Sequence, residues 1–331
     1  MIDRLVKEQL RNDYEIAGML AKYNGSPAVF YQKAPPDTAR AWERPNFPRV
    51  DYNFDKRYDS ERNVSGILTV NVWCTSESKY MPEDIEKRIL YLMNGCFYSE
   101  PSGSPDDRPA DNRPDNRPSA EEQLTTCVMW NRSDAFISSR SVISSEPETF
   151  GITLLFDLTE FPPQITTDPD PVQGLNVYAK YYFPGVTVIA GQGNPLPDVW
   201  RPTDANPALY WRFIGTTTDN RQTYAVNWYY GEFAAHIIAE TVLERNRWIK
   251  AIVEKIQVDG EVILPDRSPM LAQRIVIRHS ADPVREGQIL LTGRYGVLTP
   301  PRKDPAQIPL NNAIYPNLNM EVRYDGRRSN Q

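Results

Sequence analysis

Hydrophobic and polar residues alternate along residues 66–73, in the run Ile67-Leu68-Thr69-Val70-Asn71-Val72-Trp73. Leu68, Val70 and Val72 fall on one side of this run, which is typical of a half-buried β-strand rich in β-branched residues. Pro82 and the acidic residues after it are typical of a helix start. Apolar residues then recur at helical spacing as far as Met93. The pattern predicts a strand followed by a helix.

A similar alternation returns at 224–230, where Asn227 takes the place of Asn71 between apolar residues. The residues after it predict a longer helix over 232–256, with one apolar stripe. This stripe is formed by Ile238, Val242, Leu243, Ile249, Ile252 and Ile256. We therefore predict one fold used twice in the chain.

The other segments follow the same order in each half. In the first half, an amphipathic helix is predicted over 2–22, a strand over 49–54 and a last strand over 150–158. In the second half, the strand over 49–54 corresponds to 207–213, and the last strand corresponds to 287–291. The predicted class is α+β, with two tandem, similar domains, each a small mixed or antiparallel sheet packed by one or two helices. The predicted bounds are 1–162 for the first domain, 163–173 for a Pro-rich linker, 174–299 for the second copy and 300–331 for an extended C-terminal arm.

Composition narrows the function classes. The chain has 331 residues, which favours about two domains. Its 37 basic and 43 acidic residues give a net charge of −6, which argues against a dedicated nucleic-acid binder. The three cysteines have no paired spacing and are expected to be reduced. We expect no signal peptide and no membrane span, because no apolar run is long enough.

Residues 99–119 form a low-complexity loop that repeats Asp-Asn-Arg-Pro at 111–114 and 115–118. Proline and alternating charge without apolar residues do not form a core, so we expect a solvent-exposed loop. Its arginines, Arg108, Arg113 and Arg117, are candidate interface residues, although nearby aspartates cancel their charge. Trp73 is a fourth candidate, expected beneath a helix or an interface, whereas Trp228 is expected in the core.

Candidate catalytic and ligand-binding motifs are weak. His236 and Glu240 would lie one turn apart on the predicted helix, but no second histidine accompanies them, and His279 is expected in a surface turn. The Gly191-Gln192-Gly193 run lacks the further glycine and lysine of a phosphate loop. We therefore expect no catalytic residue, cofactor or metal. The aromatic groups near 178–183 and 228–230 leave one alternative open, a carbohydrate-binding module or hydrolase.

The order of these motifs resembles the tail terminator (tail completion) proteins of long-tailed bacteriophages. The resemblance covers about residues 1–160 and rests on the stretches Pro27-Ala28-Val29-Phe30, Ala34-Pro35-Pro36, Pro48-Arg49-Val50, 66–73, 83–93 and Glu148-Thr149-Phe150-Gly151-Ile152. It is fainter in the second half, where 175–183 takes the place of the opening helix and the Ala-Pro motif is missing. Most of the family has one copy of the domain, so two copies would be a departure.

The resemblance implies a structural virion protein of the tail or neck, made in the host cytoplasm. Such proteins cap the tail tube as a six-fold ring, join it to neck or connector proteins, and let DNA pass through the lumen. For a two-domain subunit, it implies either a trimer with pseudo-six-fold symmetry or a hexamer. Its partners would be further copies of itself, the tail tube protein and the neck proteins, with no specific DNA binding and no membrane. A baseplate or neck subunit of the same fold is an alternative.

Overall fold

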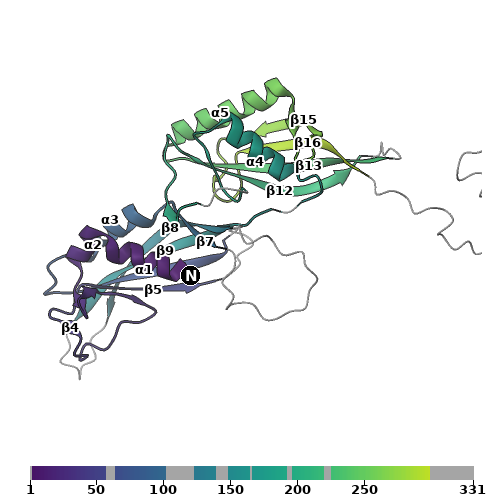
Figure 1. Ribbon diagram of the computed structural model, residues 1–331. Coiled ribbons are helices and arrows are strands. Elements are labelled where there is room, and N and C mark those ends of the chain that lie inside the picture. Colours follow the sequence, from purple (N-terminus) through teal and green to yellow (C-terminus); the bar gives the residue numbers. More distant parts are fainter. Residues whose placement is uncertain are drawn as a thin grey trace, which may run out of the picture.

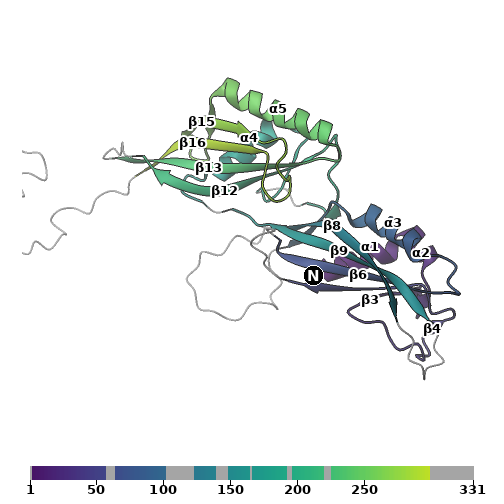
Figure 2. The ribbon, with the colours of Figure 1, turned by 180° about the vertical axis from the view of Figure 1, so that it is seen from behind.

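The computed structural model describes residues 2–56, 64–101, 123–138, 148–164, 166–191, 196–219 and 225–298. The chain forms two lobes, and each is a curved sheet with helices on one side (Figure 1 and, from behind, Figure 2). The predicted α+β class is confirmed.

The first lobe contains a seven-stranded sheet in the order β11-β7-β8-β9-β6-β5-β3. Its strands are β3 (Val29–Tyr31), β5 (Arg49–Asp55), β6 (Gly66–Thr75), β7 (Cys96–Pro101), β8 (Gln123–Ser138), β9 (Thr149–Phe161) and β11 (Val199–Trp200). Three helices cover one face, α1 (Ile2–Asn12), α2 (Tyr14–Met19) and α3 (Pro82–Met93). A small sheet, β2-β1-β4, stands beside it, formed by β1 (Lys22–Tyr23), β2 (Ser26–Pro27) and β4 (Trp42–Glu43).

The second lobe contains a six-stranded sheet in the order β10-β12-β13-β16-β15-β14. Its strands are β10 (Thr187–Val188), β12 (Ala208–Thr218), β13 (Val226–Ile238), β14 (Glu261–Ile263), β15 (Pro269–Ile277) and β16 (Ile289–Leu298). Two helices, α4 (Pro171–Tyr182) and α5 (Val242–Asp259), pack on one face of this sheet. Their buried residues, among them Leu175, Ile249 and Ile252, meet the inward-facing residues of the strands.

The two sheets share strand order and direction. When β11 is set aside, the orders β7-β8-β9-β6-β5-β3 and β14-β15-β16-β13-β12-β10 correspond strand for strand. The parallel pairs are β3 with β5 and β10 with β12, and every other neighbouring pair is antiparallel. Both sheets also have a register shift in the same strand, at Trp130/Arg132 in β8 and at Ala272/Arg274 in β15.

The structure corrects three predicted helices. The helix expected over 2–22 is two helices, because Asp13 caps a new one by accepting a hydrogen bond from the Ile16 amide. The helix expected from 232 begins only at Val242, because β13 continues to Ile238. The opening helix of the second half is present as α4, and it begins at Pro171, inside the predicted linker.

The correspondence between the two sheets also has a different register from the predicted one. Val50 pairs with Val72 in the first sheet, and Leu209 pairs with Ile237 in the second. If Val50 corresponds to Leu209, as predicted, then Asn71 corresponds to His236 and not to Asn227. The shared Val-Asn pattern therefore matched two different places along equivalent strands.

Gly151 provides a test of how closely the first sheet is packed. A Cβ atom at this position would lie 1.9 Å from the Val72 carbonyl oxygen and 2.7 Å from the Phe136 ring. Because backbone cannot move aside cheaply, we expect Gly151→Ala to lower the free energy of unfolding by about 3 kcal/mol, measured by chemical denaturation. Gly215→Ala in β12 is the matched control, because a Cβ atom there would have no neighbour within 4 Å. Equal effects of the two substitutions would contradict the packing argument.

Candidate functional site

Trp73 lies in a polar network on the sheet face that the helices leave open. Its neighbours Val72 and Cys74 face the core beneath the helices, so Trp73 points the other way. The expectation that a helix covers Trp73 is wrong, and the alternative that an interface covers it stays a prediction. The Trp73 indole donates a hydrogen bond to Asp51 Oδ2 (2.6 Å) and packs edge-on against Phe136. The network thus fixes the ring in place.

The same network joins three neighbouring strands. Asn71 donates to Asp51 Oδ1 (2.7 Å), and Thr153 donates to Asn71 Oδ1 (2.7 Å). Burial raises the pKa of Asp51, while the bonds from Asn71 and Trp73 act in the opposite direction. These side chains satisfy one another across the strands, which indicates a role in holding β5, β6 and β9 together.

The other three candidates, Arg108, Arg113 and Arg117, lie outside the described residues. Their place relative to Trp73 therefore stays a prediction. Among the residues that it describes, no group of three His, Cys, Asp or Glu side chains is arranged to hold a metal ion.

The two histidines have different environments. His279 lies in an exposed turn, as predicted, and its Nδ1 is 3.1 Å from Asn246 Oδ1. His236 lies on β13 and not on a helix, and it is buried between Tyr210 and Phe161. Burial, with a contribution from nearby Arg212, lowers the pKa of His236 to about 4. At neutral pH the ring is uncharged, and its Nδ1 meets the Pro283 carbonyl at 3.0 Å.

All three cysteines are buried and unbridged. Burial raises the pKa of Cys74 to about 12 and also raises the pKa values of Cys96 and Cys127. Since the thiolate is the nucleophile, these thiols are held in their unreactive form.

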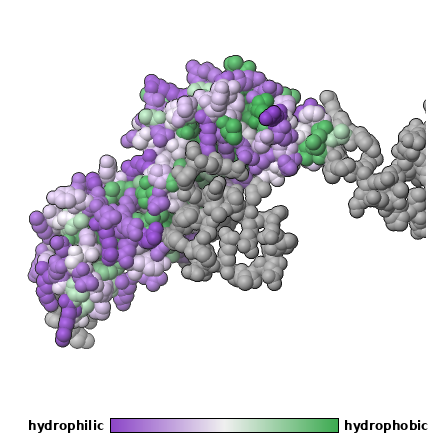
Figure 3. All heavy atoms as spheres, viewed as in Figure 1, coloured by the Kyte–Doolittle hydropathy of each residue, from purple (hydrophilic) through white to green (hydrophobic). Residues whose placement is uncertain are grey.

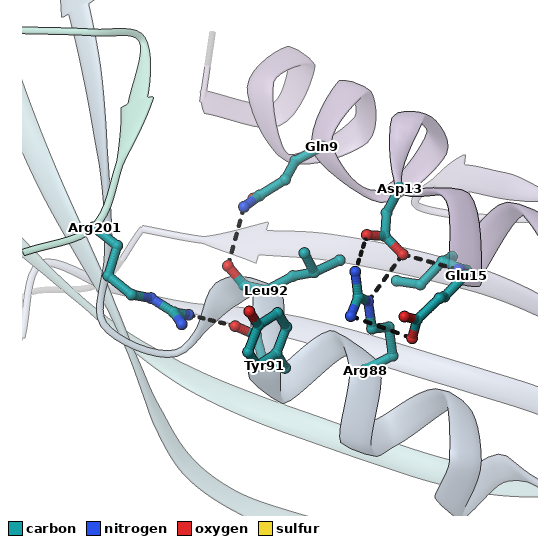
Figure 4. Close-up of polar contacts among 8 residues, drawn as sticks. Gln9, Asp13, Glu15, Arg88, Tyr91, Leu92 and Arg201 are labelled. Carbon is teal, nitrogen blue, oxygen red and sulfur yellow. Dashed lines mark hydrogen bonds and ion pairs between the residues drawn. The ribbon is translucent and has the colours of Figure 1, made fainter. Parts of the chain in front are cut away.

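An open groove of about 580 Å³ runs between α2 and α3. Arg88 crosses it to bind Asp13 and Glu15, with Arg88 Nη2 at 2.6 Å from Asp13 Oδ2 (Figure 4). The same view shows Gln9 donating to the Leu92 carbonyl. The groove is also lined by Tyr14, Tyr80 and Tyr91. It is an aromatic and charged surface, open to solvent.

The junction of the two lobes combines strand pairing, ring stacking and polar contacts. Strand β11 comes from the second half of the chain but pairs with β7 of the first sheet, Val199 opposite Tyr98 and Trp200 opposite Phe97. The Trp200 and Phe97 rings stack with centroids 4.9 Å apart. The chain thus covers an edge of its first sheet with a segment of its second half.

Polar contacts flank this stacked pair. Arg201 donates to the carbonyls of Tyr91 (2.5 Å) and Asn94 (2.8 Å) at the end of α3, and Figure 4 shows the first of these bonds. Cations are favourable at this end of a helix. Arg285 pairs with Asp157, whose side chain is 3% exposed, across the junction.

An apolar cluster fills the space beneath. The first half contributes Phe97, Cys127 and Phe161, and the second contributes Ile189, Ala208, Tyr210, Ile238 and Val284. Hydrophobic patterning did not predict this junction, because β11 has only two residues in a Pro-rich connection. One sequence feature could have indicated it, because Trp200-Arg201-Pro202 is similar to Trp42-Glu43-Arg44-Pro45 of the first half.

The predicted core position of Trp228 is wrong. This residue is half-buried on β13, with the Arg294 guanidinium 4.3 Å from its ring centroid. The aromatic cluster at 178–183 lies mostly on α4, where Tyr178 is buried and Tyr181 is 76% exposed.

His236 predicts a pH dependence. Its pKa in the folded chain is below the ordinary value of 6.5, so the unfolded chain binds the proton first, and stability is lost as the pH falls from about 6.5 towards 4. Between pH 7 and pH 5 we expect this group to remove about 2 kcal/mol from the free energy of unfolding. His236→Gln should flatten that part of the profile, whereas His279→Gln should not. Identical profiles for the two variants would contradict the assignment.

The contribution of the Arg285–Asp157 pair to the contact between the lobes can be measured as a change in the free energy of unfolding. Arg285→Met removes the cation from a buried carboxylate, to which Asn131 still donates at 2.8 Å. We expect a loss of about 2–3 kcal/mol in chemical denaturation, at the low end for a broken buried pair because the arginine is 28% exposed. Arg274→Met, at an exposed position on β15, is the control and should change little. A loss of the same size in both variants would show that the pair does not join the lobes.

Comparison with known proteins assigns no family. No protein-family model matches the chain, and no curated protein matches it at a significant level of similarity. Within the described residues, no helix is long and apolar enough to cross a membrane.

Proposed function

We propose that this chain is a structural subunit of a phage tail, a tail terminator that caps the tail tube and joins it to the neck as a ring. The observation that carries the proposal is the repeated unit: helix, short parallel strand, strand pair, helix, and three further strands occur in the same order in both lobes. The resemblance to tail terminators rests on that order. We take the repeat to be a tandem duplication, so that two units in one chain replace two copies of a single-domain protein.

The junction supports a role in assembly. The two units join through an added edge strand, stacked rings and a charged pair, all of which are features of specific protein interfaces. A unit that docks against a second unit within the chain is suited to build a ring of such units. Three chains would give a pseudo-six-fold ring, and six would place the second unit elsewhere in the assembly.

The partners of such a ring are the tail tube protein and the neck proteins. The net charge of −6 suits a lumen through which DNA passes, because affinity for DNA comes largely from basic residues. A baseplate or neck subunit of the same fold would use the same ring at another place in the particle.

One observation favours a second candidate function, the binding of a carbohydrate. The groove between α2 and α3 presents Tyr14, which is 89% exposed, and Tyr91, which is 64% exposed. Exposed rings of this kind offer stacking surfaces for sugar rings, and the charged groups beside them offer hydrogen bonds.

Electron microscopy of the source particles, with the chain antibody-labelled, tests the proposal. We expect label at the junction of head and tail, and a count of copies there distinguishes a trimer from a hexamer. Label at the far tip would move the role to the baseplate. Absence of label from every particle would overturn the structural role, and specific binding on a glycan array that is lost in Tyr91→Ala would then support the carbohydrate function.

A further inference from the structure

The junction within the chain provides a template for a contact between chains. In the first lobe, β11 pairs with the edge strand β7. Phe97, Cys127 and Phe161 are buried beside this pairing, each with no more than 1% of its surface exposed. In the second lobe, the corresponding strand β14 ends its sheet and has β15 as its one neighbour among the described strands. Within the described residues, this second edge is therefore open to another strand.

Equivalent positions follow from the strand registers. Cys127 lies opposite Phe97, as Pro269 lies opposite Ile263, with the bulges of β8 and β15 in the same place. After the bulge, Arg132 faces Leu155 and Arg274 faces Thr292, and six residues further on are Phe161 and Leu298. Ile263, Pro269 and Leu298 thus occupy the positions of the buried trio.

These three positions are exposed in the second lobe. Ile263 is 51% exposed and Leu298 is 73% exposed, and Pro269 is also exposed. Figure 3 shows apolar surface at the end of this lobe where the described chain leaves β16. A face that is core-like in one unit is therefore open in the other. We call Ile263, Pro269 and Leu298 the β14 patch.

The opposite end of the molecule has a segment that resembles β11. Strand β4 lies in the connection between β3 and β5, as β11 lies in the connection between β10 and β12. A similar motif starts at the first residue of β4, Trp42-Glu43-Arg44-Pro45, and at the last residue of β11, Trp200-Arg201-Pro202. Strand β4 has β1 on one side and no described strand on the other.

The β4 segment is held in a fixed shape by its own lobe. The Trp42 indole donates to the Pro36 carbonyl (3.1 Å), and Asn46 donates to the Asp37 carbonyl (3.0 Å). Arg49 pairs with the Asp37 carboxylate, and Trp42 packs edge-on against Phe30. Because the segment is already ordered, pairing through its free edge would cost little conformational entropy.

The two surfaces are placed for repeated head-to-tail contact. Strand β4 lies at the end of the first lobe that points away from the second lobe in both views (Figure 1, Figure 2). One chain therefore presents the donor segment at one end and the open patch on the other lobe. Contacts of this type are heterologous and close into a ring when the rotation between copies allows it.

We propose that β4 of one copy pairs edge to edge with β14 of the next copy, beside the β14 patch, as β11 pairs with β7 within the chain. This inference rests on the ring of the proposed function and names its subunit contact. Every unit of the ring would have its sheet edge covered by the next unit.

Site-directed cross-linking tests the pairing. Glu43 and Glu261 are exposed, and their cysteine variants would be reactive, whereas the native cysteines are buried. We expect a short bismaleimide to link Glu43→Cys with Glu261→Cys when the two full-length variants are mixed, and to give no dimer with either variant alone. The double variant should give a covalent series that ends at the copy number of the ring. Links within a single variant, or an oligomer without links in the mixture, would overturn the proposal.

A charge on the patch provides the second test. Ile263→Lys should raise the dissociation constant of the assembly, measured by light scattering, at least tenfold more than Val242→Lys does. Val242 is the matched control, since it is 59% exposed at the start of α5, at the other end of that helix from β14. Circular dichroism of both variants should match that of the wild type.

Three outcomes show whether the contact, the proposed function or both fail. A wild-type chain that stays monomeric at every concentration overturns the β4–β14 contact, while label at the head–tail junction would leave the structural role standing. If Ile263→Lys lowers the stability of a monomer and Val242→Lys does not, the same chain covers the patch, and the contact between copies is overturned. If the purified chain forms a cross-linked ring but no source particle carries the antibody label, the contact is supported and the tail function is overturned.

Discussion

The covering of a sheet edge is the interaction on which the arrangement of this protein depends. An edge strand exposes unpaired N–H and C=O groups and is a site for pairing with any other strand. Strand β11 satisfies the edge of β7, with the Ser99 amide bonded to the Asp198 carbonyl at 3.0 Å. Because β11 belongs to the second half of the chain, satisfying this edge also fixes where the second lobe lies.

Other contacts add to that one constraint. The Trp200–Phe97 stack buries apolar surface next to the paired edge. Arg201 donates a hydrogen bond to a backbone carbonyl at the C-terminal end of α3. The Arg285–Asp157 pair adds a charged contact between the same two lobes. A buried ion pair contributes modest net stability but costs much when one partner is removed, so it favours a single arrangement of the lobes. Apolar burial stabilises the contact between the lobes, and the polar contacts fix the orientation of one lobe relative to the other.

The two faces of the first sheet have different roles. Helices α1, α2 and α3 close one face over an apolar core, which is what the alternation of β6 requires. The other face carries the Asp51–Asn71–Thr153 network and Trp73, where polar groups satisfy each other across strands. In the second lobe, His236 takes the place of Asn71 and is buried instead, because the first lobe packs near it through Phe161. Corresponding positions of the two sheets thus differ according to what covers them.

Local pattern determined alternating strands such as β6 and the α3 helix, because alternation and the acidic start after Pro82 depend on neighbouring residues alone. It did not predict β7, because residues 99–101 were expected in the loop over 99–119 and instead belong to that strand. It also determined the α+β class and the repeated order of elements. The start of α5 and the place of His236 were predicted wrongly, since the apolar run through Ile237 and Ile238 fits a helix stripe and a buried strand equally well. The pairing of β11 with β7 and the environment of Trp73 were decided by the tertiary structure. They depend on contacts between residues that lie far apart in the chain, and local periodicity carries no information about which edge a short strand will meet.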